Sequence, residues 1–259
     1  MKKFKGFSTV GVIIAIAIIA AIGIGSYIVI DGNNKATDYT KYDFYSIINP
    51  DEHNGNIGDH FKGNKNAPTL IFEYADFQCP GCASINSRVN AAVEKSEGKL
   101  AIVYRSFLLS YHQNGTAAAS AAEAAGLQDP EGTLGYWKKY ADALFSYQSE
   151  WEYASASERT SMFEKYFETI TEGKGSLDQF RTDVASDRVS KKISFDMGIG
   201  KRIDISGTPA FYVDGQKIDW ANNEGGQVII NGKTISWDSA QSGEQFVDLL
   251  LKIADAKTK

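Results

Sequence analysis

The sequence predicts an α/β fold with an inserted helical subdomain, preceded by a single N-terminal transmembrane helix. Two short apolar strand patterns, Thr69–Tyr74 and Leu100–Arg105, flank a helical pattern, as expected for a β-α-β unit. Between about residues 114 and 196, strand patterns are scarce and helical periodicity is frequent. Residues 10–30 carry no charge and are mostly Ile, Val and Ala, a length sufficient to cross a bilayer as a helix.

The N-terminal segment predicts an uncleaved signal anchor at residues 10–30. Three lysines within residues 1–9 precede the apolar stretch, and this charge places the N-terminus in the cytoplasm and the rest of the chain outside. A cleaved signal peptide is the alternative, with small residues at 23–25 as the cleavage site. Because the apolar run continues well past that site, it favours the anchor. Both interpretations deliver the domain to an oxidising compartment, and we expect a single-pass protein of a bacterial cell membrane.

The remaining chain divides into a linker and a domain. Residues 31–65 are polar and rich in Asn, Asp and Gly, which predicts a linker or stalk, although the aromatic residues at 39–48 indicate that part of it packs on the domain or the membrane face. Residues 66–257 are expected to form the domain. The chain has 32 acidic against 27 basic residues and no basic patch outside its N-terminus, so we expect no nucleic-acid partner.

The elements of the domain follow in a definite order. After the strand at Thr69–Tyr74, a helix is predicted at Pro80–Glu97, with Gly98 placed to end it. The strand at Leu100–Arg105 should then pair in parallel with the first strand through a right-handed crossover. Four amphipathic patterns would build the helical subdomain: Thr116–Ala125, Gly135–Tyr147, Ser157–Thr171 and Leu177–Lys192. Their aromatic residues, including Trp137 and Tyr140, are expected in the core.

Two hairpins and a helix complete the chain. Asp214-Gly215 separates two short strand patterns and predicts a tight hairpin turn. A second hairpin pattern surrounds Asn231-Gly232 within residues 228–235. The last helix is predicted at Gly243–Ala256.

The two cysteines, Cys79 and Cys82, are the only ones in 259 residues. Pro80 suits the first helical position, so Cys79 should lie at the helix N-terminus, where unpaired N–H groups and the helix dipole favour a thiolate. Cys82 lies one turn further in, within bonding reach of Cys79 and more buried. A cysteine so placed can have its pKa lowered from about 8.5 to between ~3.5 and ~7.5. This layout predicts a redox dithiol in which Cys79 is the nucleophile that forms a mixed disulfide and Cys82 resolves it.

A Cys-x-x-Cys pair has two other uses, half of a zinc site or a structural disulfide. Zinc needs about four ligands, and besides the two cysteines the sequence offers only His53, His60 and His112, so we expect no metal. A lone histidine in a loop, such as His112, is more often a surface residue, so we expect His112 at the surface. A structural disulfide would close too small a loop to add much stability through chain entropy.

The segment Glu73–Cys82 resembles the active site of the thioredoxin superfamily. Its Phe-Gln-Cys-Pro-x-Cys motif, with an acid six residues before the first cysteine, is similar to that of the DsbA-like thiol:disulfide oxidoreductases. A second match at Ser206–Gly215 is similar to the family's cis-proline loop and the strand after it. The resemblance covers roughly residues 59–257. It implies a thioredoxin fold whose helical subdomain is inserted between two halves of the core, with one hairpin before the final helix, so this chain has one hairpin in excess.

The resemblance also implies roles for site residues. Glu73, a carboxylate in an otherwise apolar strand, would be the acid beneath the dithiol that accepts the Cys82 proton; a strand-end glutamate facing solvent is the alternative. Thr208 and Pro209 would face the dithiol and pair their backbone with extended substrate. By the same resemblance, Pro80 and Gly81 would belong to the substrate-binding loop of the active site. Gly81 stands where the strongest oxidases of the family tend to have histidine, which implies a milder oxidant.

The sequence therefore predicts an extracytoplasmic, membrane-anchored thiol:disulfide oxidase that introduces disulfides into exported polypeptides through Cys79–Cys82. It would need no cofactor beyond that redox-active disulfide. A membrane redox partner would re-oxidise or reduce the dithiol, and we expect a monomer. A disulfide reductase or isomerase is one alternative, and a peptide-binding chaperone module with an incidental dithiol is another.

Overall fold

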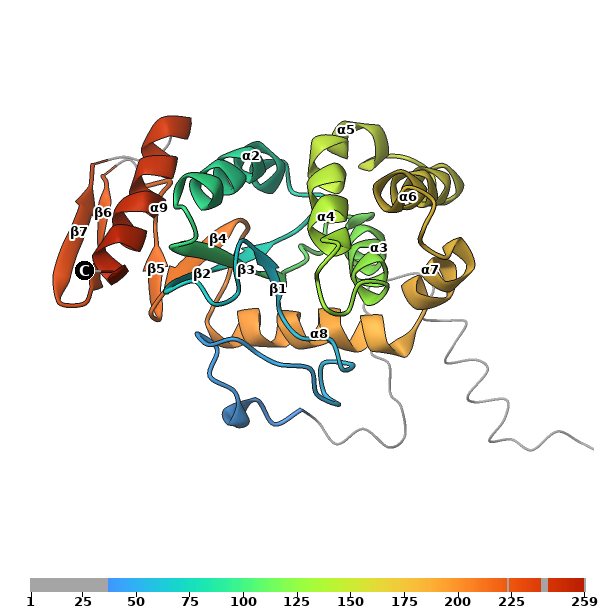
Figure 1. The fold of residues 1–259 in the computed structure, drawn as a ribbon, viewed down its shortest axis with the longest axis horizontal. Helices are drawn as coiled ribbons and strands as arrows, with labels where there is room; N and C mark the ends of the chain where they lie inside the picture. The colour runs from blue at the N-terminus through green and yellow to red at the C-terminus, as the bar shows by residue number, and fades with distance from the viewer. Residues whose placement is uncertain (1–36, 223, 239–241, 259) are drawn as a thin grey trace, which may run out of the picture. The chain divides into compact units, whose positions relative to one another are not determined.

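A mixed five-stranded sheet lies at the centre of the fold (Figure 1). The computed structural model describes residues 37–222, 224–238 and 242–258. The strand order is β1-β3-β2-β4-β5; β2 and β3 are parallel, and the other pairs are antiparallel. The strands are β1 His60–Lys62, β2 Thr69–Ala75, β3 Leu100–Ser106, β4 Ala210–Val213 and β5 Gln216–Ile218. The predicted α/β architecture and parallel β-α-β unit are confirmed.

Helices cover both faces of this sheet. Helix α2, Pro80–Lys95, and helix α9, Gly243–Thr258, pack together over one face, and helix α8, Asp187–Arg202, covers the other (Figure 1). All seven residues of β3 are buried, because a central strand covered on both faces has no solvent side. The sheet thereby holds the carboxyl ends of β2 and β3 side by side, next to the start of α2.

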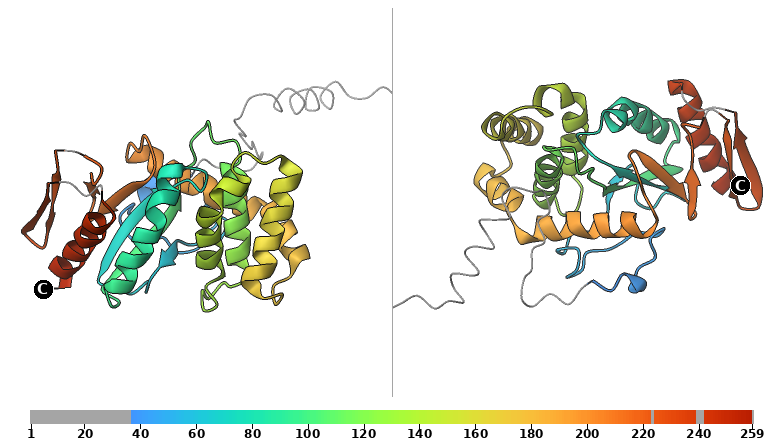
Figure 2. Two further views of the ribbon diagram at one scale, coloured as in Figure 1. Left: turned by 90° about the horizontal axis from the view of Figure 1, so that it is seen from above. Right: turned by 180° about the vertical axis from the view of Figure 1, so that it is seen from behind.

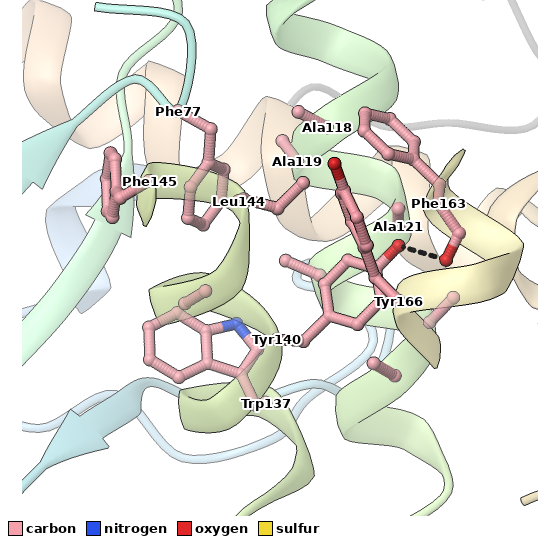
Figure 3. Close-up of a cluster of buried hydrophobic side chains, with 14 of the residues drawn as sticks. Phe77, Ala118, Ala119, Ala121, Trp137, Tyr140, Leu144, Phe145, Phe163 and Tyr166 are labelled. Atoms are coloured by element: carbon pink, nitrogen blue, oxygen red, sulfur yellow. Dashed lines mark hydrogen bonds between the residues drawn. The ribbon is translucent and has the colours of Figure 1, made fainter. Parts of the chain in front are cut away.

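The helical insertion stands beside the sheet, on the opposite side from α9 and the C-terminal hairpin (Figure 2). It contains α3 Gly115–Leu127, α4 Tyr136–Ser146, α5 Gln148–Trp151, α6 Ala156–Thr171 and α7 Leu177–Val184. The alanines of α3 allow the aromatic side chains of α4 and α6 to approach closely (Figure 3). Tyr140 donates its hydroxyl to the carbonyl oxygen of Phe163 at 2.8 Å, which satisfies a fully buried polar group. Trp137 and Tyr140 are buried, as predicted.

The linker predicted at 31–65 is corrected in part: its aromatic residues at 39–48 pack on the domain, as one of the two expectations had it, but the packing continues to strand β1. From Asp38 on, this segment packs on the domain, beginning with the 3-10 helix η2, Tyr39–Lys41, and ending in strand β1. The side chain of Asp59 is buried and pairs with Arg105 of β3 at 2.8 Å. The expected start of the domain at residue 66 is therefore too late. Strand β1 is short and polar in sequence, and its place in the sheet depends on pairing with β3, which no local pattern reveals.

The helix predicted at Leu177–Lys192 is two helices. Helix α7 ends at Val184, and Ser186 caps α8 by accepting a hydrogen bond from the backbone N–H of Val189. Helix α8 then continues to Arg202, beyond the predicted end of the insertion at 196. It therefore belongs both to the insertion and to the covering of the sheet.

Both predicted hairpin turns are confirmed. Asp214 and Gly215 join β4 to β5, and Asn231 and Gly232 join β6 Gly226–Ile230 to β7 Lys233–Trp237. All four turn residues have positive φ, as a type I′ turn requires. Strands β6 and β7 form a separate two-stranded sheet beside α9. The excess hairpin is thus an addition at the edge of the core.

The predicted N-terminal anchor at 10–30, its cytoplasmic residues 1–9 and the alternative cleavage site at 23–25 lie outside the described residues. Within the described part of the chain, no helix is long and apolar enough to span a membrane. The anchor therefore stays a prediction.

Candidate active site

The dithiol lies where β2 passes into α2. Cys79 is the N-cap residue of α2 with extended backbone angles, and Pro80 occupies the first turn, so the helix dipole is directed at the Cys79 sulfur as predicted. Cys82, one turn further, is fully buried, whereas Cys79 is 6% exposed. Both sulfurs are free thiols, so the structure represents the reduced protein.

The surroundings of Cys79 favour its thiolate. Its pKa is lowered from 9.0 to about 5, mainly because the Cys82 thiol donates a hydrogen bond to it. The Thr208 hydroxyl and the backbone N–H groups of Cys82 and Gly81 act in the same direction, and together these donors outweigh desolvation. As a thiol, Cys79 donates to the carbonyl oxygen of Thr208 at 3.3 Å. The buried Thr208 hydroxyl has no hydrogen-bond partner of its own, so it is available to the thiolate.

The surroundings of Cys82 have the opposite effect. Burial raises the pKa of its thiol, and the neighbouring Cys79 and Glu73 raise it further. Cys79 is therefore favoured as a thiolate with some solvent exposure, and Cys82 is favoured as a buried thiol. Titratable groups whose pKa values are driven apart in this way are typical of sites that separate nucleophile and leaving-group roles.

The second sequence match faces the first across the site. The Thr208–Pro209 peptide bond is cis, as the resemblance implies. A Cβ atom built on Gly81 would lie 3.3 Å from Pro209 Cδ and 3.6 Å from Cys79 Sγ. The Pro80-Gly81 turn is thus in contact with the proline loop, and any side chain at position 81 would be placed between that loop and the nucleophilic sulfur.

Glu73 is completely buried in β2, and neither of its carboxylate oxygens has a hydrogen-bond partner. Desolvation raises the pKa of its carboxyl group; Lys62 opposes this effect and Asp142 adds to it. The alternative of a strand-end glutamate facing solvent is wrong. A carboxyl group with a raised pKa, electrostatically coupled to Cys82, has the chemistry of a proton carrier.

Lys62 was not identified from the sequence. This lysine, fully buried in β1, donates a hydrogen bond to Asn86 Oδ1 and lies 3.8 Å from Asp142 Oδ1. A buried cation needs compensating partners, and Asn86 and Asp142 supply them here. The surrounding sequence is polar and has no strand periodicity, so it gave no indication that Lys62 is buried.

The turn before Cys79 is fixed by a buried aspartate. Asp76 accepts hydrogen bonds from the backbone N–H groups of Gln78 and Leu109, both at 2.9 Å, and His112 Nδ1 lies 2.8 Å from its second oxygen. The expectation that His112 is a surface residue is therefore wrong, since its side chain is only 11% exposed. Its partner, Asp76, is distant in sequence, and this explains why the single histidine appeared to have no role.

Side chains of the helical insertion also hold this turn. Gln148 of α5 donates its amide to the carbonyl oxygens of Phe77 at 2.6 Å and Cys79 at 3.1 Å. Gln78 donates to the carbonyl of Glu152 at 2.7 Å and accepts from the backbone N–H of Asn114 at 2.6 Å. The insertion therefore contributes directly to the position of the nucleophile.

His60 and His53 each lie beside an acidic residue. His60 Nε2 lies 2.7 Å from Glu123 Oε2 and its ring stacks on Trp137, and His53 lies 3.7 Å from Glu52. Among the described residues, no cluster of three or more His, Cys, Asp or Glu side chains is arranged to hold a metal ion.

A dithiol with divergent pKa values at a helix N-terminus, facing a cis-proline, is the site of a thiol:disulfide oxidoreductase. A family model described as Thioredoxin matches residues 55–231, and the chain belongs to this family. The match begins within the segment predicted to be a linker, in agreement with the position of β1.

Curated relatives are matched over very different shares of their length. The protein named Na(+)/H(+) antiporter NhaA 3 of Salinispora tropica is 30% identical over 159 residues, which cover 61% of this chain but only 22% of that protein. This chain therefore spans less than a quarter of the length of that relative. The probable disulfide bond formation protein D of Bacillus anthracis is 23% identical over 221 residues and is matched over 91% of its length.

Solved structures share the fold. Wolbachia pipientis alpha-DsbA1 has a TM-score of 0.53 at 20% sequence identity, covering 78% of this chain and 94% of that one. The catalytic domain of Proteus mirabilis ScsC has the same TM-score at 14% identity, covering 78% and 90%. These likenesses establish a thioredoxin-like fold with a helical insertion.

Proposed function

We propose that the protein is a thiol:disulfide oxidase that introduces disulfides into exported polypeptides through Cys79 and Cys82. The observation that carries this proposal is the stabilised thiolate of Cys79, whose pKa is about 5. A thiolate stabilised by the fold favours the reduced protein over its disulfide, so the disulfide is readily transferred to a client. The name of the Bacillus anthracis relative agrees with this direction.

The proposed reaction has two exchange steps. A client thiolate attacks Cys79 Sγ of the disulfide, the Cys79–Cys82 bond breaks, and its electron pair goes to Cys82, which takes up a proton. A second client thiolate then attacks the client sulfur of the mixed disulfide, and Cys79 leaves as a thiolate. The client is oxidised to a disulfide and the protein is reduced to the dithiol. Cys79 is the attacked sulfur because it is the more exposed of the two.

Other residues have supporting roles in this proposal. Glu73 exchanges the proton of Cys82 from beneath the dithiol. The backbone of Thr208 and Pro209, beside the exposed edge of Cys79, pairs with extended client chain, and Pro80 and Gly81 form the opposite side of that site. No cofactor beyond the disulfide is required, because both electrons are carried by the two sulfurs.

The cellular setting is also proposed from the sequence. Residues 10–30 would anchor the protein in a bacterial cell membrane, with residues 1–9 in the cytoplasm and the catalytic domain outside. A membrane redox partner would re-oxidise the dithiol after each turnover. Proteins named as antiporters contain a similar sequence, and this supports placing the domain at a membrane.

A disulfide reductase is the second candidate, and Gly81 is the feature that favours it. Without a side chain at position 81, the turn contributes only backbone N–H groups to the Cys79 thiolate. A less stabilised thiolate would give a less oxidising disulfide.

A stoichiometric transfer assay separates the two candidates. The oxidised full-length protein is mixed with a reduced, unfolded polypeptide that carries one thiol pair, and client disulfide is quantified by alkylation and mass spectrometry. An oxidase converts close to one client per protein, and the Cys79→Ser variant converts none. Negligible transfer by the oxidised protein, together with reduction of a disulfide client by the dithiol form, would instead support the reductase.

A further inference from the structure

The active-site turn is held to the helical insertion by the side chain of Gln148. This buried residue of α5 uses both hydrogens of its amide on the backbone of the turn, donating to the carbonyl oxygens of Phe77 at 2.6 Å and Cys79 at 3.1 Å. The Cys79 carbonyl also accepts from the backbone N–H of Ala83 at 3.1 Å, which is the first hydrogen bond of α2. Gln148 therefore binds the peptide group at which the turn becomes the helix.

The core of the insertion fixes where Gln148 lies. Trp151 comes one turn later in α5, so its side chain and that of Gln148 lie on the same side of this short helix. Trp151 is fully buried, donates its indole N–H to the carbonyl oxygen of Leu144 at 2.9 Å, and packs edge-on against Phe163 with the ring centroids 5.4 Å apart. Leu144 and Phe163 belong to the buried cluster of Figure 3. Because Trp151 cannot move without disturbing that cluster, a rigid element presents the Gln148 amide to the turn.

A second set of hydrogen bonds closes a ring between the turn and the insertion. The backbone N–H of Asn114 donates to Oε1 of Gln78 at 2.6 Å, and the Gln78 amide donates to the carbonyl oxygen of Glu152 at 2.7 Å. The side-chain amide of Asn114 donates at 3.0 to 3.2 Å to three carbonyl oxygens at the end of α5, those of Trp151, Glu152 and Ala154. The ring satisfies carbonyl groups that a helix end leaves unpaired, and it ties both ends of α5 to residues 77–79.

The orientation of the Cys79 carbonyl is linked to the direction of the Cys79 sulfur. It fixes the torsion ψ of Cys79, which is 121° and relates this side chain to the helix that follows. The donors that lower the pKa of Cys79 to about 5 include the Cys82 thiol and the backbone N–H groups of Cys82 and Gly81 in the first turn of α2. Hydrogen bonds weaken steeply when the donor moves out of line. A turn that could rotate about ψ would therefore lose part of the stabilisation of the thiolate.

We propose that Gln148 is a positioning residue for disulfide exchange: its amide holds the turn so that the donors of α2 converge on the Cys79 sulfur, and through this contact the insertion sets how readily the disulfide is transferred. This role rests on the proposed function, in which the client is oxidised to a disulfide and the protein is reduced to the dithiol. Loss of the contact destabilises the Cys79 thiolate of the reduced protein, whereas the disulfide form has no thiolate to destabilise. The equilibrium constant for transfer to the client therefore falls.

The test replaces Gln148 by methionine in the full-length protein. Gln148→Met keeps the approximate length of the side chain and removes both N–H donors. The midpoint of the Cys79 alkylation rate against pH should rise by about 1 pH unit, because the donors no longer converge on the sulfur. The equilibrium constant between the protein disulfide and glutathione at pH 7 should then fall by about tenfold, equivalent to ~30 mV for this two-electron pair.

Gln128→Met is the matched control. Gln128 caps the end of α3 in the same insertion, where its amide donates to the carbonyl oxygen of Ser176 at 2.8 Å and accepts from the backbone N–H of Ser176 at 2.7 Å. This variant also loses a glutamine bridge between two segments, but the bridge does not reach the active-site turn. Both the alkylation midpoint and the glutathione equilibrium should keep their wild-type values, whatever stability denaturant unfolding shows to be lost. A residue with a purely structural role would not give this separation.

Three results would each overturn the role of Gln148. They are an unchanged alkylation midpoint in Gln148→Met, an unchanged glutathione equilibrium in that variant, or equal shifts in Gln128→Met. If circular dichroism shows that Gln148→Met does not fold, Gln78→Met decides, because it opens the same ring from the side of the turn and should shift both quantities in the same direction. Alkylation needs no client. A shifted midpoint in Gln148→Met, together with a wild-type protein that transfers no disulfide to a client, would therefore reject the proposed function and leave the positioning role intact.

Discussion

The sulfur of Cys79 lies 3.3 Å from the carbonyl oxygen of Thr208, although 129 residues separate them in the sequence. The antiparallel pairing of β2 with β4 brings them together, because it places the C-terminal end of β2 beside the loop that precedes β4. The parallel β2–β3 pair holds β2 in the centre of the sheet. The helical insertion occupies most of the intervening chain. The proposed reaction depends on this proximity, since the attacked sulfur and the client-binding backbone must share one site.

The first prediction concerns the acidity of Cys79. Its alkylation rate should titrate with a midpoint near pH 5, because donors around the sulfur stabilise the thiolate. Cys82→Ala should raise this midpoint, since the Cys82 thiol is the largest source of that stabilisation. The measurement is the iodoacetamide reaction rate against pH, with Cys79→Ser as the blank. A wild-type midpoint near that of an unperturbed thiol, about 8.5, would contradict the prediction.

The second prediction is the pH dependence of stability. The folded-state pKa of Cys79 is depressed below its unfolded value, so its contribution to the stability of the reduced protein grows as the pH rises above about 5 and is lost as the pH falls through 5. The oxidised protein has no such group. Denaturant unfolding of both forms is measured between pH 4 and pH 8. The free energy of unfolding of the reduced form should rise relative to that of the oxidised form as the pH increases. A Cys79→Ser, Cys82→Ser protein has no thiol to ionise, so its stability should lack the rise with pH that the reduced wild type shows.

A third prediction isolates Glu73. Glu73→Gln removes the proton that Cys82 needs and should slow the Cys82-dependent exchange by roughly 10²-fold, the lower end for general acid catalysis. Alkylation of Cys79 should remain within about twofold of wild type, because its stabilising donors do not include Glu73. Stopped-flow formation of the mixed disulfide from the oxidised protein measures this step. The control is Glu164→Gln, which removes a carboxylate paired with Arg181 within the helical insertion. Equal rates in wild type and Glu73→Gln would remove Glu73 from the mechanism.

The fourth prediction tests the consequence of glycine at position 81. Gly81→His adds a donor beside the Cys79 thiolate and should make the disulfide more oxidising. A Cβ at this position would lie 3.3 Å from Pro209 Cδ, so a small loss of stability is expected as well. Gly81→Ala carries the same steric cost without the donor and serves as the matched control. If both variants shift the potential equally, the steric contact and not the donor is responsible.

The sequence predicted the parts of the site that are local. Pro80 after Cys79 placed the sulfur at a helix N-terminus, and the isolated carboxylate of Glu73 in an apolar strand indicated its burial. Both predictions are confirmed. The sequence could make them because each depends only on residues within one turn or one strand. The cis bond at Pro209 followed only from the family resemblance.

The residues that the sequence did not reveal act over long separations. Lys62 is buried by α2 and α4, Gln148 reaches Cys79 from the insertion, and the partner of His112 precedes it by 36 residues. Each is a polar residue that local pattern assigns to the surface. Their burial depends on specific hydrogen bonds between distant elements, and periodicity contains no information about such bonds.

The central claim, that the fold favours the dithiol and makes the protein an oxidase, is tested most directly by the redox potential of Cys79–Cys82. The full-length protein is equilibrated in graded glutathione buffers at pH 7, and the reduced fraction is read by thiol alkylation. We predict a potential well above roughly −200 mV, toward the oxidising end of the range for such pairs. A value near roughly −270 mV, typical of a reducing dithiol, would contradict the account and favour the reductase.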